Sequence, residues 1–242
     1  MSRKLHLQTR KLHRYLGAFI GIQFLFWTIG GLYFSWNNMK DVHGKTLLDK
    51  SEHILGFDYN EPVRKLLTVV PKPIKTIEGI IVNTDSLLRV KTSQGVRLLK
   101  LNKNQHNIRE YLTEEQVLAF VKSRLKSEIP IRKIEFLQED HISKAHEYRE
   151  KPLPVYGVHL EHETNTIVYV NPELAKITSV RNDNWRRFDF LWMLHVMDFE
   201  TRDHITNWTL RIFSVLGLAT ILSGFYLFYL SSPTIRKLKK KV

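Results

Sequence analysis

Two apolar stretches without charge, one near each end of the chain, constrain its fold more than any other feature. They cover residues 16–34 and 212–230, and each is nineteen residues long. Because a helix rises about 1.5 Å per residue, nineteen residues are just enough to cross a hydrocarbon core of about 30 Å. The sequence between them is polar and mixed, and it is long enough to build a core of its own. We therefore expect two membrane-spanning helices that flank a folded region.

The basic residues are distributed in a way that predicts the orientation of these helices. The formal net charge is +13, and ten of the 37 basic residues lie before residue 16 or after residue 230, where no acidic residue occurs. Basic flanks remain on the cytoplasmic side of a membrane and are attracted to anionic lipid. We therefore expect both termini in the cytoplasm, the central region outside, membrane lipid as a partner, and no nucleic-acid partner.

The first apolar stretch is expected to be a retained anchor. It is longer than the core of a signal peptide, and residues 35–38 offer no small-residue cleavage pattern. Gly17 and Gly21 form a G-x-x-x-G pattern, which would let this helix pack closely against the second span. Ordinary glycine usage in a membrane helix explains the pattern equally well.

The central region alternates between helix and strand patterns in two similar rounds. The first round is a helix at 61–69 followed by strands at 74–82, 87–92 and 96–101. The second opens on a capping box at 113–116 and continues with strands at 131–137, 154–161, 166–171 and 175–180. A charged stretch at 138–152 is expected to be an exposed loop. The pattern predicts an α+β fold, with helices packed on antiparallel sheet in two related units.

Seven segments follow from these patterns. They are basic tails at 1–15 and 232–242, spans at 16–36 and 209–231, α+β units at 37–111 and 112–184, and an aromatic, membrane-proximal segment at 185–208.

Three motifs, taken in order, resemble the PepSY-associated transmembrane family. They are RKLHRYLG at the first span, VYGVHLEHETNTIVYVNPELAKITS in the second α+β unit, and WRRFDFLWMLHVMDF before the second span. The resemblance covers residues 10–34 and 113–230 and implies that the unit at 112–184 is an extracytoplasmic PepSY-like domain. One departure is the turn NPELAK, where the family would have aspartate, proline and a glycine.

The resemblance implies two functions of different kinds. Some members of the family are haem-binding reductases of the bacterial inner membrane, which pass electrons toward iron–siderophore complexes. By that analogy the chain would belong to a transmembrane electron-transfer system, in which it binds b-type haem. The alternative is a membrane-anchored PepSY module that binds or restrains an extracytoplasmic protein without redox chemistry. Whether the chain is itself an enzyme stays open, and we see no nucleophile–base constellation in it.

The absence of cysteine limits how iron could be held. Without cysteine, thiolate ligation and thioether-linked haem are excluded, so a haem would be held by histidine or methionine. The chain has no G-x-G-x-x-G motif after a strand, so an electron donor would be a flavin-containing or other redox partner protein.

Two histidines next to the spans are the main candidate haem ligands. His13 lies within one turn of the first span, where it could ligate iron or contact lipid phosphates. His195 would share one face of a helix over 185–199, a face formed by Phe188, Leu191, Trp192, His195 and Phe199. Its buried imidazole needs a partner, which could be iron, Asp198 or a backbone carbonyl.

Other histidines complete the set of expectations. His204 and His43 should lie outside near the membrane, where either could be a second ligand beside His195. His159 and His162 do not fit the H-E-x-x-H zinc motif and are expected on a hairpin surface. His13 and His195 should lie at opposite faces of the bilayer, too far apart to share one iron. A second copy of the chain, as in a homodimer, or a partner subunit would then complete each site.

Overall fold

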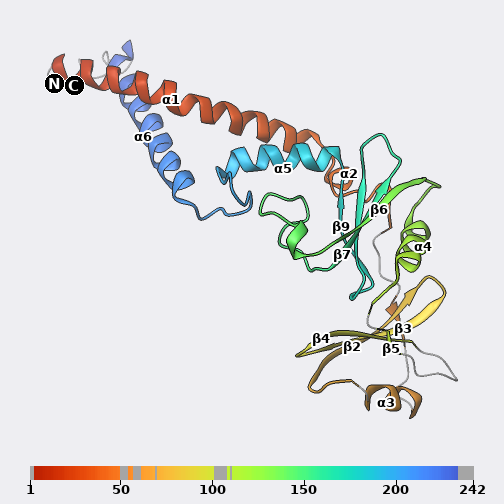
Figure 1. Cartoon of the computed structure of the whole chain (residues 1–242). Coiled ribbons are helices and arrows are strands. Elements are labelled where there is room, and N and C mark those ends of the chain that lie inside the picture. Colours follow the sequence, from red (N-terminus) through yellow and green to blue (C-terminus); the bar gives the residue numbers. More distant parts are fainter. Residues whose placement is uncertain are drawn as a thin grey trace. The chain divides into compact units, whose positions relative to one another are not determined.

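The computed structural model describes residues 3–49, 54–56, 61–68, 70–100, 108–109 and 111–233 (Figure 1). The chain forms two compact units, one made of Met1–Asn37 with Arg187–Val242 and the other of Asn38–Arg186. It is an α+β protein with two antiparallel sheets and two long apolar helices that could span a membrane. The basic residues predicted to form the C-terminal tail, at 236–241, lie outside the described residues.

The first sheet of the Asn38–Arg186 unit follows the predicted strands closely. After the short helix α2 (Met39–Val42) and helix α3 (Glu61–Thr68), the chain forms a meander in the order β1-β2-β3-β4-β5. Its strands are β1 (Ile54–Leu55), β2 (Ile74–Val82), β3 (Asp85–Thr92), β4 (Gly95–Lys100) and β5 (Ile108–Arg109). The turns at 83–84 and 93–94 fall where the sequence predicted them, because Asn83 takes a positive φ of 57° and Gly95 one of 129°.

The second sheet repeats this plan behind helix α4 (Glu114–Arg124). The predicted capping box is present, since the Thr113 hydroxyl accepts from the Gln116 amide and the Gln116 side chain accepts from the Thr113 amide. The strands are β6 (Ile131–Leu137), β7 (Val155–Leu160), β8 (Ile167–Asn171) and β9 (Lys176–Arg181), in the order β6-β7-β8-β9. A short 3-10 turn, η1 (Glu139–His141), follows β6.

One apolar core joins the two rounds of helix and strand into a single unit. Leu87 and Leu98 of the first sheet pack in the same cluster as Val117 of α4 and Val158 of the second sheet. The residues next in sequence to the first pair, such as Leu88, point to the opposite face, where they pack with α3. Because both faces of this sheet are covered, its central strand β3 is buried at four successive residues, Leu87 to Val90, and not at alternate ones.

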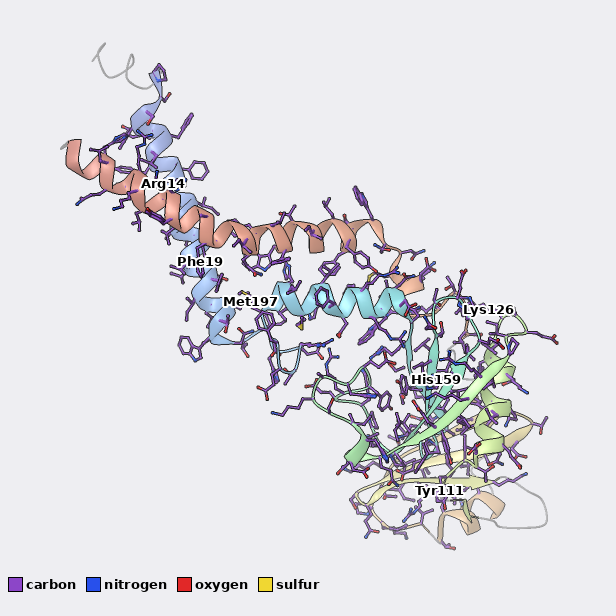
Figure 2. All side chains as sticks on the ribbon, turned by 45° about the horizontal axis from the view of Figure 1, so that its top comes forward. Arg14, Phe19, Tyr111, Lys126, His159 and Met197 are labelled. Carbon is purple, nitrogen blue, oxygen red and sulfur yellow. The ribbon has the colours of Figure 1, made fainter. Side chains whose placement is uncertain are left out.

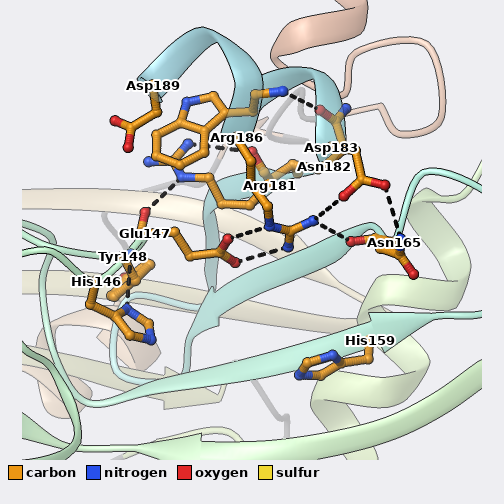
Figure 3. A network of polar contacts seen from close by, with 12 residues as sticks. His146, Glu147, Tyr148, His159, Asn165, Arg181, Asn182, Asp183, Arg186 and Asp189 are labelled. Atoms are coloured by element: carbon orange, nitrogen blue, oxygen red, sulfur yellow. Dashed lines mark hydrogen bonds and ion pairs between the residues drawn. The ribbon is translucent and has the colours of Figure 1, made fainter. Parts of the chain in front are cut away.

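The charged segment 138–152 is not a wholly exposed loop, and that prediction is wrong for its second half. Tyr148 is fully buried and stacks on Tyr169 at 4.6 Å between ring centroids. The Glu147 carboxylate accepts from Nε of Arg186 at 2.8 Å (Figure 3). It also accepts from the Tyr169 hydroxyl at 2.8 Å. Burial and the neighbouring Glu147 carboxylate raise the pKa of Tyr169, which keeps it a neutral donor. The charges are tolerated here because each carboxylate oxygen has a charged or hydroxyl partner.

The turn between β8 and β9 holds an alanine in a left-handed backbone conformation. Asn171 closes the turn by accepting from the Leu174 amide at 2.8 Å. Ala175 has a φ of 48°, a left-handed conformation that glycine adopts without cost. An alanine therefore occupies a strained position in this turn.

Helix α1 (Arg3–Trp36) carries the other unit and packs against two different helices. Its N-terminal half contacts α6 (Trp208–Ser231), with Phe19 and Phe213 at 5.4 Å between ring centroids. Its C-terminal half contacts α5 (Asp183–Val196), with Phe34 and Phe188 at 4.7 Å. The residues of α5 from Arg187 onward belong to this unit.

The outward faces of α1 and α6 are apolar. Exposed residues on them include Phe19, Ile22 and Leu25 of α1 and Val215, Leu222 and Phe225 of α6. A water-soluble helix buries residues of this kind, whereas a helix in lipid presents them to the hydrocarbon. The two helices therefore have both the length and the surface of membrane spans.

The glycines that allow α1 and α6 to meet belong to the second span, so the prediction for Gly17 and Gly21 is wrong. A methyl group on Gly17 or Gly21 would have no neighbouring atom within 4 Å. On Gly217 it would lie 3.1 Å from Cζ of Phe24, and on Gly224 it would lie 3.2 Å from Cε1 of His13. The reason is that α1 presents large side chains to α6, which needs small residues opposite them.

We expect Gly217→Leu to weaken the packing of α1 on α6, because a larger side chain would displace Phe24. Overpacking of this kind costs about 1–3 kcal/mol. Thermal unfolding of the full chain in mild detergent, followed by tryptophan fluorescence, measures the effect. Gly17→Leu is the matched control and should leave the transition unchanged. Equal effects of the two substitutions would contradict this account of the helix pair.

Candidate functional site

His195 lies in the last turn of α5, surrounded by aromatic rings. The imidazole centroid is 5.7 Å from the Trp27 ring, 5.9 Å from the Trp192 ring and 6.3 Å from the Phe34 ring. The Trp192 ring is nearly parallel to it, at 10°. Nδ1 of His195 is buried and has no hydrogen-bond partner among the described residues. Of the three partners the sequence allowed, neither Asp198 nor a backbone carbonyl takes this position.

The end of α5 is held by side chains from both neighbouring helices. The last carbonyls of a helix have no partner within it. Here the last three are satisfied at 2.8–2.9 Å by a side-chain N–H: Gln23 donates to Leu194, Trp27 to His195 and Asn207 to Val196. Asn207 is also the N-cap of α6, since its Oδ1 accepts from the Leu210 amide. The backbone of His195 is thereby fixed to α1 and to the start of α6.

The predicted stripe on this helix is confirmed for Phe188, Trp192 and His195 and is wrong at its end. Phe188, Trp192 and His195 all contact the aromatic side chains of α1. Helix α5 ends at Val196, and Met197 takes a positive φ of 55°. Phe199 therefore lies beyond the helix and is exposed, because the chain leaves the helical path two residues before it.

The loop from Met197 to Asn207 is organised around the carboxylate of Asp198. This carboxylate accepts from the Thr201 hydroxyl and from the amides of Glu200, Thr201, Asp203 and His204. Burial alone would raise the pKa of Asp198, but these hydrogen bonds hold it well below its usual range. A second ion pair, Arg202 to the buried Asp189 at 2.8 Å, ties the loop back to α5.

His204, predicted as a candidate second ligand, lies in this loop with its side chain mostly exposed. Its Nδ1 is 2.8 Å from the Thr201 hydroxyl and 3.9 Å from Oδ2 of Asp198. Its backbone amide also serves the Asp198 carboxylate. These contacts show that His204 helps to hold the loop together. None of the described contacts joins it to His195.

His13 lies between α1 and α6, where its orientation and tautomer follow from its partner. Its Nδ1 is 2.7 Å from Oγ of Ser223. The Ser223 hydroxyl donates its own hydrogen to the Thr220 carbonyl at 2.7 Å, so it can only accept from His13. The neutral ring therefore carries its proton on Nδ1, which leaves the lone pair on Nε2. A histidine that ligates a metal is oriented in the same way by its second nitrogen, although helix packing alone also explains the contact.

The packing places His13 deeper than the sequence suggested. Its neighbours Ser223 and Gly224 lie well inside α6, which continues to Ser231. Seven further residues of helix correspond to about 10 Å. His13 thus lies just outside the uncharged stretch of its own helix but alongside the uncharged stretch of α6.

His13 is far from the part of α1 against which His195 packs, so the two histidines are well separated, as the sequence predicted. His195 packs on Trp27, which is fourteen residues after His13 in the same helix. Fourteen residues of helix span about 21 Å, so one iron cannot bind both histidines. Any second ligand to either would have to come from outside the pair.

Three further histidines lie in the Asn38–Arg186 unit. His43 ends α2 in the Asn38–Arg186 unit and is exposed. His159, predicted on the surface, is buried at 7% exposure with Nε2 2.8 Å from Oε1 of Glu135, so that prediction is wrong. The reason is that β7 is an inner strand, where both faces are covered. His162 is half-buried beside Thr164.

His6 is a histidine that the sequence analysis did not consider. Nε2 of His6 in α1 is buried and has no hydrogen-bond partner among the described residues. His6 precedes His13 by seven residues, or two helical turns, so the two side chains share a face of α1. That spacing was the available signal. In the described ranges no group of three or more histidine, aspartate or glutamate side chains could hold a metal ion.

Comparison with known proteins adds nothing to this geometry: no family model, no curated protein and no solved structure matches the chain.

We expect Asp198→Asn to loosen the loop before α6, because each hydrogen bond to a charged group contributes about 1.5–3 kcal/mol. Trypsin should cut at Arg202 faster in the variant. The folded-state pKa is depressed, so the contribution is complete above the ordinary aspartate pKa of about 3.9 and is lost as the pH falls below it. The stability difference from wild type, measured by thermal unfolding, should therefore persist from neutral pH to about pH 5 and shrink below about pH 4. Asp203→Asn, in the same loop but exposed, is the control. A difference that does not depend on pH would contradict the role given to the carboxylate.

Proposed function

We propose that the chain is a membrane component of a transmembrane electron-transfer system and that His195 holds a b-type haem. The observation that supports this is the buried Nδ1 of His195, which has no partner among the described residues and lies inside a ring of aromatic side chains. A buried polar atom left without a partner costs about 1–3 kcal/mol. Imidazole is a common axial ligand of haem iron, and the chain has no cysteine to offer other iron chemistry.

The residues around His195 fit a ligand role. Trp27 fixes the backbone of the histidine through its carbonyl, while Trp192 and Phe34 limit the rotation of the ring. Such support holds an imidazole in one orientation before any ligand binds. The same aromatic rings exclude water from one side of the ring. Bound haem would supply a one-electron redox centre, which the protein would tune through this apolar setting.

His13 is proposed as the ligand of a second haem nearer the other end of α1. Its proton on Nδ1 is accepted by Ser223, and Nε2 is the nitrogen left for iron. Two centres about 21 Å apart along the helix would suit a relay better than one, since the hydrocarbon core measures about 30 Å. A second copy of the chain or a partner subunit would supply each remaining axial ligand. The electron donor would be a flavin-containing or other redox protein, and a ferric siderophore or another iron complex the acceptor.

The proposed location is the bacterial inner membrane, with both termini cytoplasmic and the Asn38–Arg186 unit outside. It rests on the basic residues at both ends of the chain and on the mixed charge between the spans.

The haem proposal predicts that His195→Ala and His13→Ala each lower the haem-to-protein ratio of the purified chain, because each removes one axial ligand. The measurement is the reduced-minus-oxidised absorption spectrum in detergent, with the haem per chain determined chemically. His162→Ala, in the other unit, is the control and should keep the full haem content. If both variants retain the wild-type spectrum, or if wild type expressed with excess haem supply carries none, the electron-transfer proposal fails.

The proposed topology predicts that a reporter that works only in the cytoplasm is active when it is fused after Val242. A reporter that works only outside the cytoplasm should be active when it is inserted at η1, Glu139–His141. This turn is the suitable place because it is exposed, whereas Tyr148 later in the same segment is buried. An exported C-terminal reporter would overturn the orientation.

A second candidate function is a membrane-anchored module that binds or restrains an extracytoplasmic protein without redox chemistry. One observation favours it: among the described strands, β6 lies at the edge of its sheet and pairs only with β7. An open edge can accept an extended segment of another protein as an additional strand. This becomes the better account if wild type binds no haem.

A further inference from the structure

A stripe on α1, next to the face that packs on α6, combines positive charge with two glycines that have open space above them. Arg10, Arg14, Gly17 and Gly21 recur at intervals of four, three and four residues, so they form one stripe along the helix. The residues that pack on α6, namely His13, Ile20 and Phe24, lie on a different face. A methyl group added at Gly17 or Gly21 would meet no atom within 4 Å, so the backbone is accessible there.

The charge of this stripe is unopposed. Arg10, Lys11 and Arg14 are exposed, and residues 1–40 contain no acidic residue. The last stretch of the chain, from residue 204 onward, contains none either. The contact that Arg14 makes is with its neighbour Tyr15, whose ring centroid is 5.3 Å from the guanidinium carbon. A ligand for the stripe must therefore bring its own negative charge.

The depth of the stripe identifies the source of that charge. Arg14 follows His13, which lies beside Ser223 and Gly224, about 10 Å before the end of α6 at Ser231. Figure 2 shows Arg14 and Phe19 on the part of α1 that α6 crosses. Arginine side chains at such a level extend along the helix toward the headgroup region, where lipid phosphates lie.

We propose that this face of α1 binds an anionic phospholipid. The guanidinium groups of Arg10 and Arg14 hold the phosphate, with Lys11 beside them. One acyl chain lies along the groove at Gly17 and Gly21, where the absent side chains leave room for it. Arginine binds phosphate in two-point geometry, and two arginines one turn apart present their donors on the same side of the helix.

Charge favours a lipid over a second copy of the chain at this face. A G-x-x-x-G pattern alone would suit a second helix. Two copies inserted in the same orientation would bring Arg10 and Arg14 of one directly against those of the other. Like charges at close range repel strongly where water is scarce. An anionic headgroup removes that repulsion, whereas a second helix creates it.

The test is native mass spectrometry of the full chain, released from nanodiscs made of equal parts phosphatidylglycerol and phosphatidylcholine. Wild type should retain phosphatidylglycerol with at least a tenfold preference. Arg10→Gln with Arg14→Gln should reduce that preference to less than twofold. Gly17→Leu with Gly21→Leu should reduce the amount of retained lipid. The lipid that is still retained should show an unchanged preference for phosphatidylglycerol. Arg211→Gln, an exposed arginine at the other end of α6, is the matched control and should behave as wild type.

Two outcomes would overturn the proposal. One is a preference that survives Arg10→Gln with Arg14→Gln, or that Arg211→Gln reduces to the same extent, since the binding would then reflect general charge. The other is a wild-type dimer that Gly17→Leu with Gly21→Leu converts to a monomer without loss of lipid, since the face would then bind a second copy. Haem content has no part in either readout, so the test stands apart from the proposed function.

Discussion

The membrane-associated unit depends on how the end of α5 satisfies its backbone. A helix that ends among apolar side chains needs donors for its last carbonyls, because water does not reach them. Gln23 and Trp27 of α1 and Asn207 of α6 supply these donors, so one set of hydrogen bonds ties three helices together. His195 lies within this set. Its position is therefore as rigid as the helix contacts themselves, whatever it binds.

The contact between α1 and α6 follows a different rule, in which large residues on one helix meet small ones on the other. Ile20, Phe24 and His13 of α1 pack against Gly217 and Gly224 of α6. In the resulting register α1 is shifted along its axis relative to α6, so that the uncharged stretches of the two helices overlap only in part. The C-terminal part of the first stretch is covered by the aromatic face of α5 instead. This offset explains why basic residues of α1 lie beside apolar residues of α6, and it creates the stripe to which we assign a lipid.

The α+β unit was predictable to a large extent because its signals are local. The alternation of apolar residues, the capping box at Thr113 and the turn residues near Asn83 and Gly95 act within a few residues, and strands and helices lie where these patterns indicated. The predictions are wrong at positions whose burial depends on residues far away in the sequence. Tyr148 lies between two charged residues in the sequence and His159 is itself polar, yet both are buried, because Tyr169 and Glu135 lie next to them in the fold.

The sequence by itself determined the elements of this protein: two apolar helices of membrane length, and two rounds of helix followed by antiparallel strands. Each depends on composition and periodicity, which are properties of consecutive residues. Only the tertiary structure decided which glycines join the spans, that Ser223 accepts from His13, and that Nδ1 of His195 is buried without a partner. These depend on the rotation and register of one helix against another. Sequence periodicity shows which residues share a face of a helix, but the neighbour that covers that face is chosen by packing across the whole unit.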